Sequence, residues 1–358
     1  MKLFVLDPMH HVNHEPDNLR RILVVHCKHR GDLNNALGIA SAISQRTGLP
    51  IHVNELALRS NILIRPLLFL TGAACWYDWS TRLVYRVFFR NSRKQQFPKH
   101  VAYVVSTLGA GEAPNVFLTR TNNAVGIHLG RPKRVPFRAI DIVVAHQGHE
   151  AGADEIALPI SPSRVMLSHY LHIEQRKGIL LAIGGNTEEV SFSDSFWRNL
   201  CIKATRFATD SHAKILITTS PRTGEALENQ ISKYLSDSGP STKKIEFYSS
   251  GTARPLTTLL ETTRVAIISC ESVSMISEGI ASGALVVAAF GGKLPQSQRI
   301  SNFLIDQQKA SRLCLWNVEA EETPNLKSLK PIKACWSDHL WDAIRELHSQ
   351  KSPKRSDI

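Results

Sequence analysis

One stretch, residues 265–290, constrains the fold of this chain most: it reads VAIISCESVSMISEGIASGALVVAAF. It opens with an apolar, β-branched run of the kind that forms a strand buried on both faces. Ser272 and Ser274 then stand where a helix would begin, and Gly283 stands where it would end. A second apolar run, residues 285–290, follows that glycine. The stretch therefore predicts a strand, a short helix and a second strand of a parallel sheet.

The short helix expected inside this stretch carries several polar side chains. Ser274 and Glu278 are four residues apart, so they share one face of the helix. The N-terminus of a helix has free backbone N–H groups and a positive dipole end, which suit a phosphate group. A carboxylate one turn later can accept hydrogen bonds from a ribose diol. The helix is therefore a candidate nucleotide-diphosphate site at the carboxyl edge of a sheet, although an ordinary serine-capped unit fits the same spacing.

The length and charge of the chain narrow its class. A chain of 358 residues exceeds what one compact core usually organises and is typical of two domains. Its formal net charge of +12 predicts affinity for polyanions such as an anionic membrane surface or phosphorylated substrates, or else a basic surface that is simply solvated. No recognisable nucleic-acid-binding module accompanies this charge, so we expect no nucleic acid among the partners.

Cysteine usage and hydropathy indicate the compartment. The six cysteines form no C-x-x-C pair, and several lie in apolar runs. This pattern favours reduced, buried thiols over a disulfide framework or a zinc site. We see no secretory signal, and no stretch is apolar for long enough to span a bilayer. We therefore expect a cytoplasmic protein.

The first half of the chain alternates apolar runs with helical patterns, which predicts a Rossmann-like domain over residues 1–160. Strands are expected at 22–27, 50–56, 101–106, 122–129 and 139–145. Asp32 follows the first strand, in a loop before a helix expected from about residue 34, and Glu112 follows a glycine loop after the third strand. Either carboxylate can act as a general base, although Asp32 can equally cap the helix and Glu112 can be a solvated loop residue.

A segment within this half, residues 62–96, is rich in leucine and aromatic residues and ends in basic ones. Arg82, Arg86, Arg90 and Lys94 are each four apart, which places a basic stripe along one face of an expected helix. Basic amphipathic helices with aromatic residues are typical of a membrane interface. The segment therefore predicts contact with an anionic membrane surface, while a core helix with a solvated basic edge explains the pattern as well.

Two prolines within residues 158–163 resist regular structure and make this segment the best candidate linker. After it the alternation restarts, which predicts a second Rossmann-like domain over residues 161–335, followed by a helix and a polar tail over 336–358. Further strands are expected at 178–183, 213–219 and 245–248, before the stretch described first. The predicted fold class is α/β, with two Rossmann-like domains in a GT-B arrangement and a cleft between them.

The loops at the carboxyl edge of the second sheet gather residues that suit phosphate. Glycines let the backbone approach a phosphate, arginine supplies a bidentate charge, and serines add donors. In chain order these loops hold Gly184, Gly185, Asn186, Ser220, Arg222, Ser272 and Ser274. The chain has no Walker motif and no G-x-G-x-x-G fingerprint, which argues against a P-loop ATPase and a simple dehydrogenase.

Three motifs, LAIGGN at 181–186, ITTSPRT at 217–223 and SVSMISE at 272–278, occur in an order and spacing that resemble the bacterial relatives of the mitochondrial fission ELM family. The resemblance covers roughly residues 20–315 and is weaker in the first half. The family is similar to GT-B glycosyltransferases, in which the helix of the third motif binds the phosphates and ribose of the donor. The resemblance thus implies donor-binding roles for Ser272, Ser274, Met275 and Glu278. Glu271 stands before this motif, where aspartate would be expected.

These observations predict a metal-independent glycosyltransferase that is peripheral on the inner face of a membrane. A nucleotide sugar, as co-substrate rather than cofactor, would bind the second domain, and a lipid-linked or cell-envelope glycan acceptor would bind the first. Asp32 or Glu112 would deprotonate the acceptor hydroxyl, and Arg222 would stabilise the departing phosphate. The resemblance also allows a non-catalytic scaffold related to organelle or membrane division, because plant members of the family are implicated in mitochondrial division. Such a scaffold would have no affinity for nucleotides.

Overall fold

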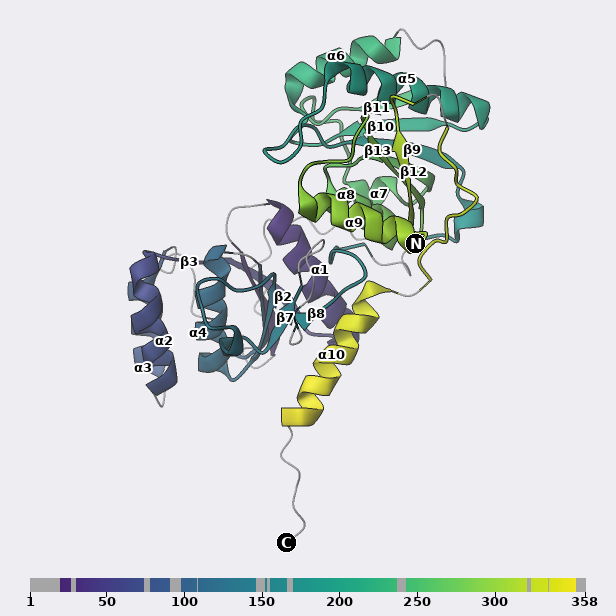
Figure 1. The fold of residues 1–358 in the computed structure, drawn as a ribbon. Coiled ribbons are helices and arrows are strands. Elements are labelled where there is room, and N and C mark those ends of the chain that lie inside the picture. Colours follow the sequence, from purple (N-terminus) through teal and green to yellow (C-terminus); the bar gives the residue numbers. More distant parts are fainter. Residues whose placement is uncertain are drawn as a thin grey trace.

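The structure, a computed structural model, describes residues 20–26, 30–73, 78–90, 98–107, 109–145, 152, 155–165, 170–236, 243–320, 323–333 and 335–351. Two six-stranded sheets run through these residues, and every strand pairing within them is parallel. Helices pack on both faces of each sheet (Figure 1). The predicted α/β class, with two Rossmann-like domains in a GT-B arrangement, is confirmed.

The first sheet has the strand order β2-β1-β5-β6-β7-β8. Its strands and main helices are β1 (Arg21–His26), α1 (Arg30–Thr47), β2 (Ile51–Glu55), β5 (Val101–Thr107), α4 (Glu112–Asn122), β6 (Val125–Leu129), β7 (Ile142–Val144) and β8 (Glu155–Ile156). In α1, Ala36, Ile39, Ala40 and Ile43 recur at helical spacing and are buried against one face of the sheet. α4 covers the other face through Val116 and its neighbours.

The second sheet has the strand order β11-β10-β9-β12-β13-β14. Its elements are β9 (Gly178–Ile183), α5 (Asp194–Asp210), β10 (Ile215–Thr219), α6 (Gly224–Ser236), β11 (Lys243–Glu246), α7 (Leu256–Leu259), β12 (Thr263–Ser269), α8 (Val273–Ala281), β13 (Leu285–Phe290), α9 (Gln298–Lys309) and β14 (Leu313–Asn317). The stretch 265–290 forms a strand, a helix and a strand as predicted. Its strand β12 lies in the middle of the sheet, between β9 and β13.

A smaller unit lies at the outer side of the first domain. It contains β3 (Ala57–Leu58), α2 (Ile64–Ala73), α3 (Asp78–Phe88) and β4 (Phe89–Arg90), with β3 and β4 paired antiparallel. Phe89 is buried, and its ring centroid lies 5.3 Å from that of Phe117 in α4. The unit therefore packs on α4, at the far left of the view in Figure 1.

The chain returns to the first domain at its end. α10 (Trp336–Lys351) contacts α1, where Arg46 donates a hydrogen bond of 2.5 Å to Asp338. The segment 158–165 lies between the domains, because Ser161 N donates to Ser277 Oγ in α8 at 3.2 Å. A Cβ on Gly38 of α1 would lie 2.5 Å from Ser163 N, so only glycine lets this segment approach α1 so closely. The predicted domain boundaries themselves stay predictions.

Some predicted elements are wrong in their bounds. α1 begins at Arg30 rather than near residue 34, so Asp32 lies within the helix and not in a loop before it. Residues 112–122 form α4, and the strand expected from 122 begins at Val125. The basic stripe does not continue along one helix, because α3 ends at Phe88 and Arg90 lies in β4. The guanidinium of Arg90 donates a hydrogen bond to Arg59 O at 2.9 Å. Lys94 lies outside the described residues.

Candidate functional site

A cleft of 1360 Å³ lies between the two domains. The first domain contributes residues of α1, of the loop after β6 and of β8, and the second contributes the loops after β10, β11 and β12. The described charged residues that line it are six basic ones, Arg131, Lys133, Arg164, Arg222, Arg254 and Arg299, and four acidic ones, Glu155, Glu189, Glu271 and Glu278. A cleft with this excess of cations attracts an anionic ligand.

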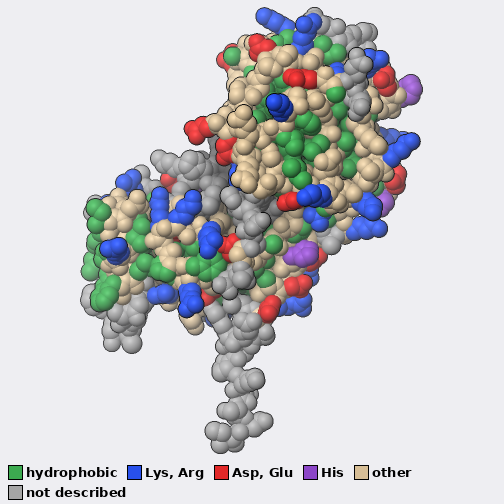
Figure 2. Space-filling view, viewed as in Figure 1, with side chains coloured by type: hydrophobic (Ala, Val, Ile, Leu, Met, Phe, Trp, Pro, Cys, Tyr) green, Lys and Arg blue, Asp and Glu red, His purple; other side chains and the backbone are tan. Residues whose placement is uncertain are grey.

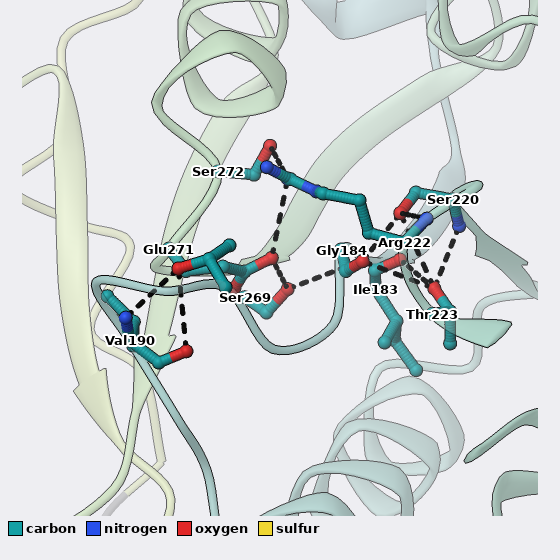
Figure 3. A network of polar contacts seen from close by, with 10 residues as sticks. Ile183, Gly184, Val190, Ser220, Arg222, Thr223, Ser269, Glu271 and Ser272 are labelled. Carbon is teal, nitrogen blue, oxygen red and sulfur yellow. Dashed lines mark hydrogen bonds and ion pairs between the residues drawn. The ribbon is translucent and has the colours of Figure 1, made fainter. Parts of the chain in front are cut away.

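The N-terminus of α8 opens onto this cleft beside an arginine. Ser272 is the N-cap residue, and its hydroxyl makes no capping bond. Instead, Arg222 Nη2 donates to Ser272 Oγ at 3.2 Å, as Figure 3 shows. The first amides of a helix lack partners within the helix, so the positive helix end and a guanidinium face the same space. Arg222 and Ser272, two of the residues chosen from the sequence for phosphate binding, therefore lie together at this helix end.

Glu271 lies directly beside Arg222, and its side chain is 0% exposed. Ser269 Oγ donates to Glu271 Oε1 at 3.2 Å, and Arg222 Nη2 lies 3.9 Å from the same oxygen. Within the described residues, Glu271 Oε2 is buried without a hydrogen-bond partner. Burial raises the pKa of Glu271 to about 8, against the opposing effects of the Ser269 hydroxyl and the Arg222 charge. Glu271 is therefore largely protonated at neutral pH.

The glycine loop after β9 packs closely against Glu271. Gly184 N donates to Ser269 Oγ at 2.9 Å, and a Cβ on Gly184 would lie 1.7 Å from Glu271 Oε1. Gly185 has a φ of +100° and presses against the backbone of Arg222. Both glycines thus serve close packing of the loops rather than lining the cleft themselves.

The loop after β10 is tied to the same glycine loop. Ser220 Oγ donates to Gly184 O at 2.5 Å, and Thr223 Oγ1 donates to Ile183 O at 3.0 Å. These bonds fix the base of Arg222. Asn186 is different, because its Oδ1 accepts from Phe192 N at 2.9 Å and the residue does not line the cleft. The structure thus gives Asn186 a role in its own loop, which argues against the predicted contact with a ligand.

One turn into α8, Ser274, Met275 and Glu278 line the cleft. Burial raises the pKa of Glu278 to about 7, and the nearby charge of Arg164 opposes this shift. Near neutral pH this carboxyl group exists in both protonation states. The ionised form is a strong acceptor for paired hydroxyl groups.

The loop after β11 forms another part of the second domain's wall, with Tyr248, Arg254 and Leu256 among its lining residues. A buried carboxylate, Glu228, fixes this loop from beneath. Its oxygens accept hydrogen bonds from Tyr248 N at 3.1 Å and from Ser249 N at 3.3 Å. Sequence reasoning missed Glu228, since a glutamate on a helix is usually a solvated residue and no motif marks it.

The first domain contributes a basic loop after β6. Arg131 and Lys133 line the cleft, and the buried carboxylate of Glu112 holds this loop in place. Glu112 accepts hydrogen bonds from Lys133 N at 3.1 Å and from Arg134 N at 2.6 Å. Both carboxylate oxygens are thereby occupied, and Glu112 does not line the cleft. This geometry argues against the predicted role of Glu112 as a general base.

Glu155 in β8 is the acid that the first domain does present to the cleft. Its side chain is 6% exposed, and Oε2 accepts from Gly152 N at 2.9 Å. Oε1 is buried with no hydrogen-bond partner among the described residues, and Arg131 Nε lies 3.7 Å from it. Sequence reasoning missed this residue, because a short edge strand gives no periodic signal. Asp32 lies in α1 near the cleft-lining Asn34 and Asn35, and its base role stays a prediction.

The unit of α2 and α3 lies away from the cleft and exposes several large apolar side chains. The exposed fractions are 84% for Ile62, 74% for Phe69, 54% for Leu83 and 53% for Val87. Arg82, Arg86 and Arg90 are exposed beside them. Figure 2 shows hydrophobic and basic side chains together at this edge of the first domain. We call these seven residues the outer face.

Within the part of the chain that the structure describes, no cluster of three or more histidine, cysteine, aspartate or glutamate side chains is arranged to hold a metal ion. No helix among the described residues has the length and apolar character needed to cross a membrane.

Comparison with known proteins gives one family match. The family model described as Mitochondrial fission ELM1 matches residues 31–336, and no curated protein sequence matches the chain. Among solved structures, S. aureus MnaA with UDP is similar at 10% identity and a TM-score of 0.42, covering 92% of this chain and 88% of that one.

Two further solved structures show similarity at the same level. The UDP-GlcNAc 2-epimerase of Methanocaldococcus jannaschii has 10% identity and a TM-score of 0.44, covering 92% of this chain and 99% of that one. The spinosyn rhamnosyltransferase SpnG has 12% identity and a TM-score of 0.41, covering 92% of this chain and 91% of that one. At such low identity the function of this chain has to be argued from its own residues.

Proposed function

The chain belongs to the mitochondrial fission ELM1 family, and we propose that it is a glycosyltransferase that uses a nucleotide sugar as donor. One observation carries this proposal: Arg222, the N-terminus of α8 at Ser272 and the carboxyl group of Glu278 converge on one cleft. A guanidinium and a helix N-terminus suit a diphosphate, and a carboxylate one turn further along suits the ribose diol.

The second domain's side of the cleft, which we call the donor wall, would hold the nucleotide sugar. Arg222 and the free amides of α8 would neutralise the charge that develops on the diphosphate as the sugar departs. Ser274 and Met275 line the space between these groups and Glu278, where we place the ribose. Tyr248, Arg254 and Leu256 form the wall available to the base. Because cations of the protein itself meet the diphosphate, the proposed reaction needs neither a metal nor a cofactor.

The first domain's side of the cleft, the acceptor wall, would bind the group that receives the sugar. We assign the general base to Glu155, whose buried Oε1 has no hydrogen-bond partner among the described residues. The acceptor hydroxyl would give its proton to Oε1 while its oxygen forms the new bond to the anomeric carbon. The bond from that carbon to the diphosphate breaks, and its electron pair leaves on the diphosphate oxygen.

The acceptor is proposed to be a lipid-linked or cell-envelope glycan at an anionic membrane surface, reached from the cytoplasmic face. The outer face supports this part, because it combines exposed apolar side chains with arginines. Apolar groups can enter the acyl boundary of a bilayer while arginines meet anionic headgroups. The outer face belongs to the same domain as the acceptor wall, so membrane contact would bring a lipid-linked acceptor near the cleft.

The test of the proposed function is nucleotide affinity. UDP, GDP, ADP, CMP and their common sugars are offered to the wild type and to Glu278→Ala, and binding is followed by calorimetry and thermal shift. A ligand that binds only the folded state raises its apparent stability by mass action. We expect one nucleotide class to bind and Glu278→Ala to weaken it by about tenfold, as expected for lost hydrogen bonds to a charged acceptor.

Absence of binding by every nucleotide would overturn the proposed function. It would favour the scaffold, which the family match leaves open. A scaffold would also tolerate Glu278→Ala without any change in ligand binding. The matched control is Glu174→Gln, which removes the charge of an exposed glutamate paired with Arg264 at 3.6 Å, outside the cleft.

A further inference from the structure

The position of Glu271 poses a chemical problem. It lies between Arg222 and the N-terminus of α8, where the proposed function places a diphosphate. An ionised carboxylate at this point would repel the ligand. Its side chain is 0% exposed, so water does not screen such a charge. Glu271 is therefore compatible with an anionic ligand only if its side chain is uncharged.

The surroundings of Glu271 favour its neutral form. Oε1 accepts a hydrogen bond from Ser269, but Oε2 is buried without a partner among the described residues. A buried charge is stable only when it is paired and hydrogen-bonded. The nearest cation, Arg222, is 3.9 Å away, half-exposed, and already donates to Ser272. This partial pairing leaves a carboxyl group that keeps its proton near neutral pH, with a pKa of about 8.

We propose that Glu271 binds the diphosphate of the nucleotide sugar as a neutral acid, donating one hydrogen bond from Oε2 to a phosphoryl oxygen. This inference rests on the proposed function. The buried Oε2 would gain the partner that the protein itself does not supply. Arg222 and the amides of α8 would reach other oxygens of the same diphosphate. A neutral donor adds a hydrogen bond to the anion without adding charge. Three different groups would then bind the diphosphate: a guanidinium, the helix amides and a neutral acid.

If Glu271 binds the diphosphate as a neutral acid, nucleotide binding is linked to protonation of Glu271. Above the pKa of about 8, free Glu271 loses its proton, and the ligand can bind only after the proton returns. Affinity then falls up to tenfold for each further pH unit, and each binding event takes up one proton. A carboxylate that accepted hydrogen bonds from the ligand would show the opposite dependence.

The other titratable groups near Glu271 can be told apart from it. Burial and the charge of Glu271 raise the pKa of Cys270, so this thiol stays neutral. Glu278 titrates near 7 and acts as an acceptor, so its contribution to affinity rises with pH through 7. Glu189 accepts hydrogen bonds from Ser297 at 2.7 Å and Arg299 at 3.1 Å. Of Cys270, Glu271 and Glu278, only Glu271 makes affinity fall above pH 8.

The experiment is calorimetry between pH 6.5 and 9 with UDP-glucose, GDP-mannose and ADP-glucose, each in two buffers of different ionisation enthalpy. Both phosphates of these ligands are esterified, so the ligand charge at the diphosphate stays constant. For the tightest binder we expect net proton release at pH 6.5, because Glu278 binds in its ionised form, and net uptake near one at pH 9. Glu271→Gln, which keeps a neutral donor, should hold affinity at pH 7 within about threefold and abolish both the uptake and the alkaline loss.

Each other outcome has a definite meaning. If none of the three ligands binds, the proposed function fails and this inference fails with it. If a ligand binds the wild type without proton uptake, the proposed function stands and the inference is overturned. A loss of more than about tenfold in Glu271→Gln at pH 7 would also overturn it, because the carboxylate would then be an acceptor. Melting temperatures of the variant and of Glu174→Gln show whether either change disturbs folding.

Discussion

The two walls of the cleft differ in how firmly their polar groups are held. On the donor wall, the loop that carries Arg222 is bonded to the glycine loop, and both meet Glu271. On the acceptor wall, Glu112 holds the backbone of the loop after β6, but the side chain of Arg131 on that loop is 76% exposed and lies 3.7 Å from Glu155. A network tied to the backbone fixes one geometry, whereas an exposed side chain can adjust. In the proposed reaction, the donor would therefore meet a preorganised site and the acceptor an adaptable one.

The largest expected effect is a loss of turnover without a loss of donor affinity. Glu155→Gln removes the proposed base while leaving its size unchanged. We expect turnover to fall by about 10²- to 10⁴-fold, the usual contribution of a general base, with donor affinity unchanged. Turnover is measured as release of the nucleoside diphosphate, with a total membrane lipid extract as the acceptor. Equal turnover in the variant and the wild type would remove Glu155 from the mechanism and leave Asp32 as the remaining candidate of the first domain.

A second substitution breaks the donor wall itself. In Gly184→Ala the new Cβ would lie 1.7 Å from Glu271 Oε1, so the acid must leave its position beside Arg222. We expect donor affinity to fall by about a hundredfold and unfolding stability to fall by about 1–3 kcal/mol, as in other overpacked sites. Binding calorimetry and urea unfolding measure the two effects.

Gly152→Ala is the matched control on the acceptor wall. Its Cβ would meet no atom closer than 3.6 Å, which is an ordinary contact. Donor affinity should stay at the wild-type value. Equal losses in the two alanine variants would mean that the donor wall is no more rigid than the acceptor wall, and the comparison would fail.

The same difference explains what the sequence could predict. The stretch 265–290 and the loops around Gly184 and Arg222 repeat strand, loop and helix with phosphate-binding residue types, so both the fold and the donor wall could be predicted from local patterns. The position of Glu155 in the cleft could not be predicted, because it depends on the pairing of β8 with β7, and no local sequence pattern indicates this pairing. The surroundings of Glu112 could not be predicted for the same reason: its partners Lys133 and Arg134 lie about twenty residues away.

The two domains should also respond to pH in opposite directions. Burial lowers the pKa of His128 in the first domain to about 4, while its Nδ1 hydrogen-bonds to Ser106 at 2.8 Å. The folded state therefore binds this proton less readily than the unfolded state, and the stabilisation is present above pH 6.5 and lost as the pH falls toward 4. Glu271 in the second domain has the opposite sign, because its raised pKa gives stability that is lost as the pH rises from 4.5 through 8.

Hydrogen exchange followed by mass spectrometry can read the two domains separately. Between pH 8 and pH 5 we expect protection of β5 and β6, corrected for intrinsic exchange, to fall by about 2 kcal/mol because His128 takes up a proton on unfolding. In His128→Gln most of this acid loss should disappear, and the remainder is expected from His26, whose pKa is also lowered by burial. The exposed His172→Gln should keep the whole loss. A wild type whose β5 and β6 keep full protection at pH 5 would contradict the buried, neutral state of His128.

The smallest expected effect concerns the outer face, which should act on the acceptor side only. Leu83→Asp with Val87→Asp removes two exposed apolar side chains of α3. We expect binding to vesicles of phosphatidylglycerol and phosphatidylethanolamine to weaken by about tenfold, since each of the two half-exposed side chains inserts on the order of one methylene group, which contributes about 0.8 kcal/mol. Co-sedimentation measures the binding, and Val53→Asp, at an exposed apolar position outside the outer face, is the control.

The electrostatic and apolar contributions of the outer face to vesicle binding can then be measured separately. Arg82→Glu with Arg86→Glu should remove the salt-dependent part of vesicle binding, because headgroup attraction is screened within about 10 Å at moderate salt. The apolar part should persist on the same vesicles at high salt. Donor affinity should stay unchanged in both double variants, because the outer face lies away from the cleft. If either variant weakened donor binding as much as Gly184→Ala does, the outer face would be coupled to the donor wall, and the division of labour between the two domains would have to be abandoned.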